Sequence, residues 1–432
     1  MRKESQMLNR TTAPDFNSIK ELHLISPDKL VLENGIQTFV FQANELDLLK
    51  FEFIFKNIYH TNSNPMLNPA LSAMMKEGTS TLTSAQIAEQ IDFYGAYLMP
   101  EFSYDYTSIT LYTTNKYVDK ALPIVSSIIK DSIIPQQELD TYIRNNKQSL
   151  QISLKKNDVV ARRLFYQNVF GENQYGTVAS LEGYNTITRE KLLELYCEQI
   201  TPANCTIMVA GRVDTSVLDL IKIHFNDNWR SDKLIYTDSK ITFPETPSHL
   251  IVETKDDALQ SAVRLGGVSI NRKHSDFPAV QFVNTLLGGF FGSRLMKNIR
   301  EEKGYTYSIG SSVASLQHTG FFTLASEVGV EVTKNTLAEI QNEFDILRQE
   351  RATVEEVELV RNYLLGSVLG SLESIFSHMD KFKAVYFYGM DLSYYQYYND
   401  VVNQMDTSKV QDIAIRYFDY DQLLKIVVGK LD

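Results

Sequence analysis

The sequence predicts an α+β protein with two tandem homologous domains, each an antiparallel β-sheet covered by helices. Three observations predict this fold. The second half repeats motifs of the first in the same order, several segments alternate polar and apolar residues, and helix start signals occur between them. The strand segments do not alternate strictly with crossover helices, which disfavours a doubly wound parallel sheet. A chain of 432 residues is long enough for a separate core in each half.

The internal repeat has a nearly constant shift. Residues 207–214 (IMVAGRVD) resemble residues 425–432 (KIVVGKLD), with Gly211 matching Gly429, 218 positions later. Two further matches have shifts of 217 and 218 residues, and a weaker one pairs Gly95 with Gly304 across gaps. Three matches at nearly one shift indicate a duplication. The two further matches are residues 138–145 (ELDTYIRN) with 355–362 (EEVELVRN), and residues 162–171 (RRLFYQNVFG) with 380–389 (DKFKAVYFYG).

The duplication also predicts where the domains begin and end. We expect an N-terminal extension over residues 1–29, a first domain over 30–214, a linker over 215–246 and a second domain over 247–432. The linker region starts with the end of a helix and then becomes polar, with two prolines just before residue 250, as is typical of connections between domains.

Within the halves, local patterns predict individual elements. Asn34-Gly35 is typical of a hairpin turn, and residues 49–55 (LKFEFIF) and 106–113 (YTSITLYT) alternate as half-buried strands do. Capping boxes predict two helix starts: Thr83 with Gln86, and Thr353 with Glu356.

Composition excludes several classes of protein. The net charge of −11 disfavours nucleic-acid binding, which relies on attraction to phosphate. The two cysteines, Cys197 and Cys205, are too few for a disulfide framework or a structural zinc site, and we expect both to be small core residues. The sequence has no signal-like apolar region and no apolar run long enough to span a membrane, so we expect a cytoplasmic protein without membrane contact.

Two segments identify a resemblance. Residues 68–79 (NPALSAMMKEGT), followed by SAQIAEQIDFYGAYL, and residues 298–308 (NIREEKGYTYS) resemble the pitrilysin and insulin-degrading-enzyme superfamily of zinc peptidases. The likeness covers nearly the whole chain and is greatest to the small-subunit branch that includes mitochondrial processing peptidase. The resemblance implies that the chain forms one half of a clamshell that encloses a chamber for peptides.

The zinc motif of that superfamily is lost in this sequence. Anchored on Gly78-Thr79, the family's H-x-x-E-H falls on residues 69–73, so Pro69 and Ala73 replace the two histidines and Ser72 replaces the catalytic glutamate. The third ligand, a glutamate in the family, falls near Gln151. The closest two of the seven histidines are 25 residues apart, so no pair of histidines can clamp zinc from one turn of a helix. We therefore expect this chain to hold no metal.

The second half retains an arginine and a tyrosine. In the family, an arginine and a tyrosine seven residues later project into the chamber, and the matching residues here are Arg300 and Tyr307. A guanidinium and a phenol can donate hydrogen bonds to a peptide carbonyl and to the charge that develops on it. The alternative is that Arg300 pairs with a glutamate on a solvated helix while Tyr307 fills a strand core. Tyr305 is an off-register competitor for the tyrosine position.

Two more segments have open interpretations. Gly288, Gly289 and Gly292 match no phosphate-binding motif, and we expect a closely packed turn between a helix and a loop. The tyrosine-rich residues 386–398 (YFYGMDLSYYQYY) are either a binding surface for a peptide or partner, or the end of a packed helix.

The resemblance implies a function. The chain is expected to be the non-catalytic, substrate-binding subunit of a heterodimeric zinc peptidase, inactive alone, with zinc held by an H-x-x-E-H partner. Three alternatives stay open: a structural or interaction protein, a solitary peptide-binding homodimer, and a zinc peptidase with relocated ligands.

Overall fold

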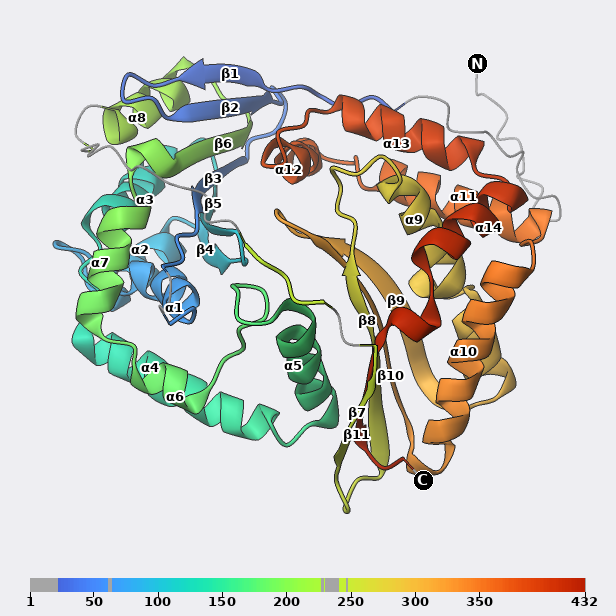
Figure 1. Cartoon of the computed structure of the whole chain (residues 1–432). Helices are drawn as coiled ribbons and strands as arrows, with labels where there is room; N and C mark the ends of the chain where they lie inside the picture. Colours follow the sequence, from blue (N-terminus) through green and yellow to red (C-terminus); the bar gives the residue numbers. More distant parts are fainter. Residues whose placement is uncertain (1–21, 61–63, 227–228, 230–240, 246–247, 432) are drawn as a thin grey trace, which may run out of the picture.

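The computed structural model describes residues 22–60, 64–226, 229, 241–245 and 248–431, and contains two sheets covered by helices (Figure 1). The first sheet has the order β1-β2-β6-β3-β5-β4 and the second the order β7-β11-β8-β10-β9. The α+β fold predicted from the sequence is confirmed. The strands are β1 (Asp28–Val31), β2 (Gln37–Gln42), β3 (Leu49–Lys56), β4 (Tyr97–Phe102), β5 (Tyr106–Thr113), β6 (Cys205–Gly211), β7 (Leu250–Thr254), β8 (Gln260–Ser269), β9 (Thr306–Ser315), β10 (Gly320–Gly329) and β11 (Leu424–Gly429).

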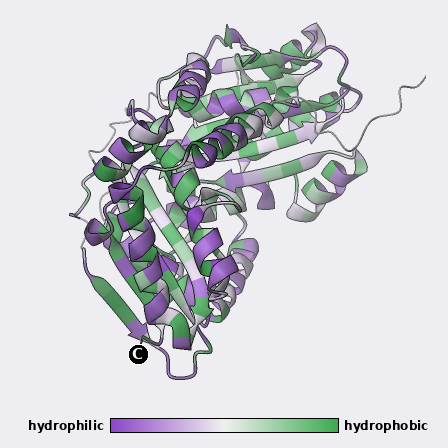
Figure 2. Cartoon of the chain, turned by 90° about the vertical axis from the view of Figure 1, so that its right-hand side faces the viewer, coloured by the Kyte–Doolittle hydropathy of each residue, from purple (hydrophilic) through white to green (hydrophobic). Residues whose placement is uncertain are grey.

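Helices before residue 226 belong to the first half of the chain and those after residue 276 to the second. Figure 2 shows hydrophilic and hydrophobic residues alternating along them, as is typical of helices that pack on one side. They are α1 (Leu67–Met74), α2 (Ser84–Phe93), α3 (Val118–Asp131), α4 (Gln136–Ser153), α5 (Asn157–Phe170), α6 (Leu181–Asn185), α7 (Arg189–Gln199), α8 (Thr215–Phe225), α9 (Phe277–Asn284), α10 (Thr333–Gln349), α11 (Val354–Gly370), α12 (Ile375–Tyr386), α13 (Ser393–Gln404) and α14 (Thr407–Tyr417).

The duplication is visible in the topology. Without the edge strand β1, the first sheet has the same strand order as the second, and β2 runs parallel to β6 as β7 runs parallel to β11. Each sheet is therefore mixed, and the prediction of a wholly antiparallel sheet is wrong for this one pair of strands in each half. The glycine pairs that the repeat matches share backbone conformations: φ is 61° at Gly95 and 67° at Gly304, and 70° at Gly171 and 73° at Gly389. Left-handed backbone at both members of a pair explains why the repeat retains glycine there.

The local start and turn signals are confirmed. Gly35 has a φ of 90° in the turn that joins β1 to β2, and these strands pair in antiparallel register. Both capping boxes form, with Thr83 and Gln86 at the start of α2 and Thr353 and Glu356 at the start of α11. Each box satisfies backbone N–H groups that would otherwise be unpaired at a helix N-terminus.

One helix of each half covers the sheet of the other half. The helix α5 packs on β8 and β11 of the second sheet, while α12 packs on β2 and β6 of the first. The helix α12 begins 218 residues after α5, so the two exchanged helices are copies of each other in the repeat. The exchange places two apolar clusters between the halves. The first contains Phe165, Phe170, Phe321, Leu424 and Ile426, and the second contains Phe39, Phe41, Met208, Met379 and Phe382.

The alternation of β3 predicts one exposed face, and this prediction is wrong. All but the last residue of β3 are buried, including Lys50 and Glu52 on the polar face. The helix α12 covers that face and supplies a partner for each charge: Asp380 accepts from Lys50 at 2.6 Å, and Lys383 donates to Glu52 at 2.7 Å. The polar positions of the alternation are therefore contacts between the halves.

Two further predictions, on the cysteines and on the linker, can be compared with the structure. Cys205 is buried as expected, but Cys197 is exposed on α7, so the prediction of a core residue was wrong there. Residues 215–225, expected to be part of the linker, form α8, whose apolar residues pack in the first core. Within the described part of the chain, no helix is long and apolar enough to cross a membrane.

Candidate functional site

Arg300 and Tyr307 lie side by side, together with Phe291. The guanidinium carbon of Arg300 is 4.5 Å from the ring centroid of Phe291 and 5.7 Å from that of Tyr307. Both rings face solvent, with exposed fractions of 64% for Phe291 and 89% for Tyr307. Cation–π contacts with two rings hold the guanidinium in place without using its N–H donors.

A sharp reversal of the chain brings these side chains together. Arg300 lies in a short π-helix, Met296–Glu302, and Tyr307 is the second residue of β9. Gly304 between them has a φ of 67°, a left-handed conformation that most residues with a side chain avoid. The turn allows a spacing of seven residues to become a direct contact.

The π-helix is fixed to α10 by polar contacts. Asn298 donates to Glu339 at 3.1 Å and to Glu343 at 2.8 Å, and Lys303 forms an ion pair with Glu339 at 3.1 Å. Burial raises the pKa of Glu343, although the hydrogen bond from Asn298 opposes this rise. Arg300 therefore projects from a helix whose other face is anchored on the second domain.

A second clamp holds the segment just before the π-helix. Arg294 donates to both carboxylate oxygens of Glu356 on α11, at 2.8 and 3.0 Å, and both side chains are largely buried. Burial alone would raise the pKa of Glu356, but the hydrogen bonds from Arg294 and from the Thr353 backbone N–H outweigh it and lower that pKa below 4.5. Charge-assisted bidentate pairs of this kind fix geometry as well as adding energy.

Replacing Glu356 by glutamine is expected to lower the free energy of unfolding by about 1.5 kcal/mol at neutral pH, because Arg294 loses a charged acceptor. A carboxylate whose folded pKa is lowered stabilises the protein above its unfolded pKa, and this contribution disappears as the pH falls through the folded pKa. The difference between wild type and variant should therefore shrink below pH 4.5. Urea titrations across this range measure it, with Glu355→Gln, an exposed neighbour in the same helical turn, as the matched control.

The surroundings of Arg300 and Tyr307 differ from the alternative of an ion-paired arginine and a tyrosine in a strand core. Among the described residues no carboxylate forms an ion pair with Arg300, and Tyr307 is exposed rather than part of a strand core. Tyr305 instead packs against the hydrophobic core inside the second half of the chain, and its N–H donates to the Ile299 carbonyl. The N–H donors of Arg300 and the hydroxyl of Tyr307 are thus accessible to a ligand.

The resemblance predicts that α1 is the counterpart of the superfamily's zinc helix. Pro69 and Ala73 are half-buried on it, Ser72 is buried, and Gln151 is exposed on α4. Proline and alanine have no side-chain donor atom for a metal, and Ser72 and Gln151 are poor zinc ligands. In the described residues no group of three or more histidine, cysteine, aspartate or glutamate side chains could hold a metal ion. The residues at this position do not fit zinc.

An aromatic cavity lies at the lost motif instead. Its volume is about 440 Å³, and Pro69 is one of the residues that line it. Leu150 and Ser153, which lie one and two residues from Gln151 on α4, also line it. Six aromatic residues form part of the remaining wall, which also includes two arginines, Arg162 and Arg163. Cavities of this size with apolar walls and a few polar groups are typical of ligand sites. The aromatic wall consists of Tyr59, Phe102, Tyr104, Tyr142, Tyr166 and Tyr184.

The glycine-rich segment is a closely packed turn, as the sequence predicts. Gly288 and Gly289 end the π-helix Thr285–Gly289, and a Cβ at Gly288 would lie 2.6 Å from the Ser311 hydroxyl and 2.8 Å from Leu295. This close approach to β9 leaves no room for a side chain at residue 288.

Sequence reasoning missed Phe291 and the aromatic cavity. Phe291 follows Gly289 by two residues, where the pattern suggests only a turn. The two large aromatic residues between Gly289 and Gly292, in a segment expected to be a turn, are the signal that could have identified it. The cavity residues come from five separate stretches of the chain, so no local pattern marks them.

Comparisons with known proteins agree with this architecture. Residues 186–364 match the family model described as Peptidase M16 inactive domain. The uncharacterized zinc protease YmxG of Bacillus subtilis is 23% identical over 366 residues, which cover 83% of this chain and 87% of the relative. The crystal structure of a peptidase M16 inactive domain from Pseudomonas fluorescens has a TM-score of 0.82 at 20% identity, covering 94% of this chain and 98% of that chain.

A crystal structure of a protease from Helicobacter pylori has a TM-score of 0.84 at 17% identity and covers 94% of this chain and 100% of that chain. The resemblance predicted from the sequence is therefore confirmed: the chain has the fold of the solved M16-type structures, and residues 186–364 match the model of the Peptidase M16 inactive domain.

Proposed function

We propose that this chain is the substrate-binding, non-catalytic subunit of a two-chain zinc peptidase, and that Arg300 and Tyr307 contact the peptide substrate. The observation that carries the proposal is the arrangement of Arg300 between two exposed rings, with no ion pair to any described residue. An arginine fixed by stacking alone keeps all its N–H donors for a ligand. A peptide carbonyl, and the negative charge that develops on it during hydrolysis, are suitable acceptors.

We assign the zinc chemistry to a partner chain because this chain lacks the residues for it. Pro69, Ser72, Ala73 and Gln151 cannot provide zinc ligands or a general base, so the metal, its bound water and the base would belong to a partner with an intact H-x-x-E-H motif. This chain would contribute donors for the substrate and one wall of the chamber. We expect neither chain to hydrolyse peptides by itself.

A chelator experiment tests the division. The purified chain alone and the assembly purified gently from its native cell are both incubated with quenched fluorescent peptides. We expect no hydrolysis by the chain alone, and hydrolysis by the assembly that a zinc chelator abolishes. Chelator-sensitive hydrolysis by the chain alone would instead favour relocated zinc ligands in this chain and would overturn the proposal.

A second candidate is a solitary peptide-binding protein, and the aromatic cavity at α1 favours it. Aromatic walls beside Arg162 and Arg163 suit an apolar or aromatic side chain of a peptide next to a carboxylate. Fluorescence anisotropy with a labelled unfolded peptide, combined with sedimentation of the chain, tests this candidate. Binding by a self-associated chain that has no other partner in the cell would support it over the two-chain peptidase.

A further inference from the structure

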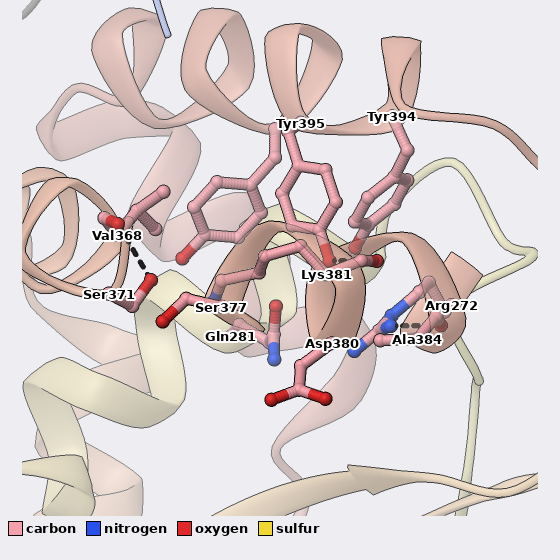
Figure 3. A pocket seen from close by; sticks show the side chains of 11 residues that line it. Arg272, Gln281, Val368, Ser371, Ser377, Asp380, Lys381, Ala384, Tyr394 and Tyr395 are labelled. Atoms are coloured by element: carbon pink, nitrogen blue, oxygen red, sulfur yellow. Dashed lines mark hydrogen bonds between the residues drawn. The ribbon is translucent and has the colours of Figure 1, made fainter. Parts of the chain in front are cut away.

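A second cavity lies in the other half of the molecule, away from the lost zinc motif. It has a volume of about 430 Å³ and is lined by residues of α9, the end of α11, α12 and α13 (Figure 3). The tyrosine-rich segment noted in the sequence forms one wall, because Tyr394, Tyr395 and Tyr398 all line the cavity. Figure 3 shows Tyr394 and Tyr395 extending from α13 toward Lys381 of α12.

Two cations face this tyrosine wall. The guanidinium carbon of Arg272 lies 5.7 Å from the ring centroid of Tyr388 and 5.5 Å from that of Tyr394, and one of its N–H groups donates to the Ala384 carbonyl. The ammonium of Lys381 lies 5.7 Å from the ring centroid of Tyr395. Within the described residues, Lys381 has no carboxylate partner and no hydrogen-bond acceptor for its ammonium, and the buried Nε of Arg272 has no acceptor.

The carboxylate in the cavity wall is already engaged. Asp380 accepts from the buried Lys50 of β3 at 2.6 Å, and Figure 3 shows its carboxylate pointing away from the labelled tyrosines. The carboxylate of Asp380 thus provides a single negative charge beside three cations, Lys50, Lys381 and Arg272. Burial, and after it the charge of Arg272, lowers the pKa of Lys381, while Asp380 only partly opposes this. The cavity therefore has an excess of positive charge that a bound anion would balance.

The other polar groups in the wall can also donate. Burial raises the pKa of Tyr395 and that of Tyr398 to about 12, so both phenols stay protonated at neutral pH. The hydroxyl of Tyr395 donates to the Lys381 carbonyl at 2.9 Å, which fixes the wall to α12. The hydroxyl of Tyr398 and the side-chain amide of Gln281 have no partner among the described residues and line the same space.

We propose that this cavity binds a small molecule that carries a carboxylate or phosphate group, held by Lys381 and Arg272 and by the phenol of Tyr398. The volume fits a small metabolite rather than a polypeptide segment. Planar, stacked guanidinium groups are suited to carboxylate and phosphate oxygens, and a lysine adds a mobile charge. The proposal does not depend on the peptidase function proposed above.

Isothermal titration of the full chain with inorganic phosphate, with citrate and with neutral glycerol tests this site, at equal ionic strength throughout. We expect phosphate or citrate to bind and glycerol not to bind, and the better of the two anions identifies the source of the oxyanion. Lys381→Gln should weaken that binding about tenfold or more, since it removes one charge-assisted contact. Lys425→Gln is the matched control, because Lys425 is also a half-buried lysine stacked on a tyrosine, Tyr420.

Tyr398→Phe provides a second, isosteric variant that removes only one donor and is expected to weaken binding severalfold while the protein stays folded. Thermal unfolding of each variant establishes that it is folded. If neither anion binds at constant ionic strength, or if both Lys381→Gln and Tyr398→Phe bind the anion as wild type does, the proposal is overturned.

Discussion

Replacing Arg300 by alanine is expected to lower kcat/KM of the two-chain assembly by about 10²–10³-fold, the loss typical of removing one preorganised donor to a developing oxyanion. The physical reason is that Phe291 and Tyr307 hold Arg300 by cation–π contacts, which leave its N–H groups free to donate to a substrate. If the donors act mainly on the developing charge, kcat falls more than KM rises. Steady-state kinetics on a fluorescent peptide measure the effect.

Three further variants separate the roles within this cluster. Tyr307→Phe retains the ring and removes the hydroxyl, so a loss of activity would indicate donation by the phenol rather than stacking. Phe291→Ala removes the closer ring and should reduce activity less than Arg300→Ala, because the guanidinium remains but is less well fixed. Lys297→Ala, an exposed cation on the same π-helix, is the matched control and should be neutral. Full activity of Arg300→Ala would contradict the assigned role.

Replacing Lys383 by methionine is expected to lower the free energy of unfolding by roughly 3–5 kcal/mol, because it leaves the carboxylate of Glu52 buried without its partner. Glu52 is only 1% exposed, and the 2.7 Å contact from Lys383 is its ion pair across the two halves. The other oxygen of Glu52 has no hydrogen-bond partner among the described residues, so no second hydrogen-bond donor holds the carboxylate once Lys383 is replaced. Urea unfolding followed by circular dichroism measures the loss.

The double variant Glu52→Gln with Lys383→Met tests the cause of that loss. Removing both charges should recover a large part of the stability, because the cost comes from an uncompensated charge rather than from lost packing. Lys334→Met, at an exposed lysine of α10, should change stability little. A Lys383→Met variant as stable as wild type would mean that α12 does not hold the halves together through this pair.

Local signals in the sequence predicted local structure well. The turn at Asn34-Gly35, the capping boxes at Thr83 and Thr353, and the repeated glycines all act within a few residues, and their backbone geometry follows from their own chemistry. The repeat predicted two similar sheets because a duplicated sequence folds into a duplicated topology.

The exchange of α5 and α12 could not be predicted in this way. The spacing of Ala161, Phe165 and Val169 shows that α5 has an apolar face, but it does not tell which sheet covers that face. For the same reason Lys50 and Glu52 resemble solvent-facing positions of β3. They form buried ion pairs because α12, which lies more than 300 residues later in the sequence, packs over this face of β3.

The candidate site was predicted in part. The family resemblance implied that Arg300 and Tyr307 form a pair, and Gly304 between them permits the contact that the structure contains. Phe291 joins the pair from the preceding loop, and Arg272 meets Lys381 from more than 100 residues away. Contacts between side chains from distant segments depend on packing, which a single sequence does not specify.

The central claim, that this chain works as half of a two-chain peptidase, is tested most directly by the composition of the assembly. The full chain is tagged in its native cell and purified gently, and the proteins that accompany it at near-equal amounts are identified by mass spectrometry. We expect a chain of similar size that carries H-x-x-E-H, with about one zinc per pair of chains. Recovery of this chain alone, or only with further copies of itself, would show that it does not work as half of a two-chain peptidase.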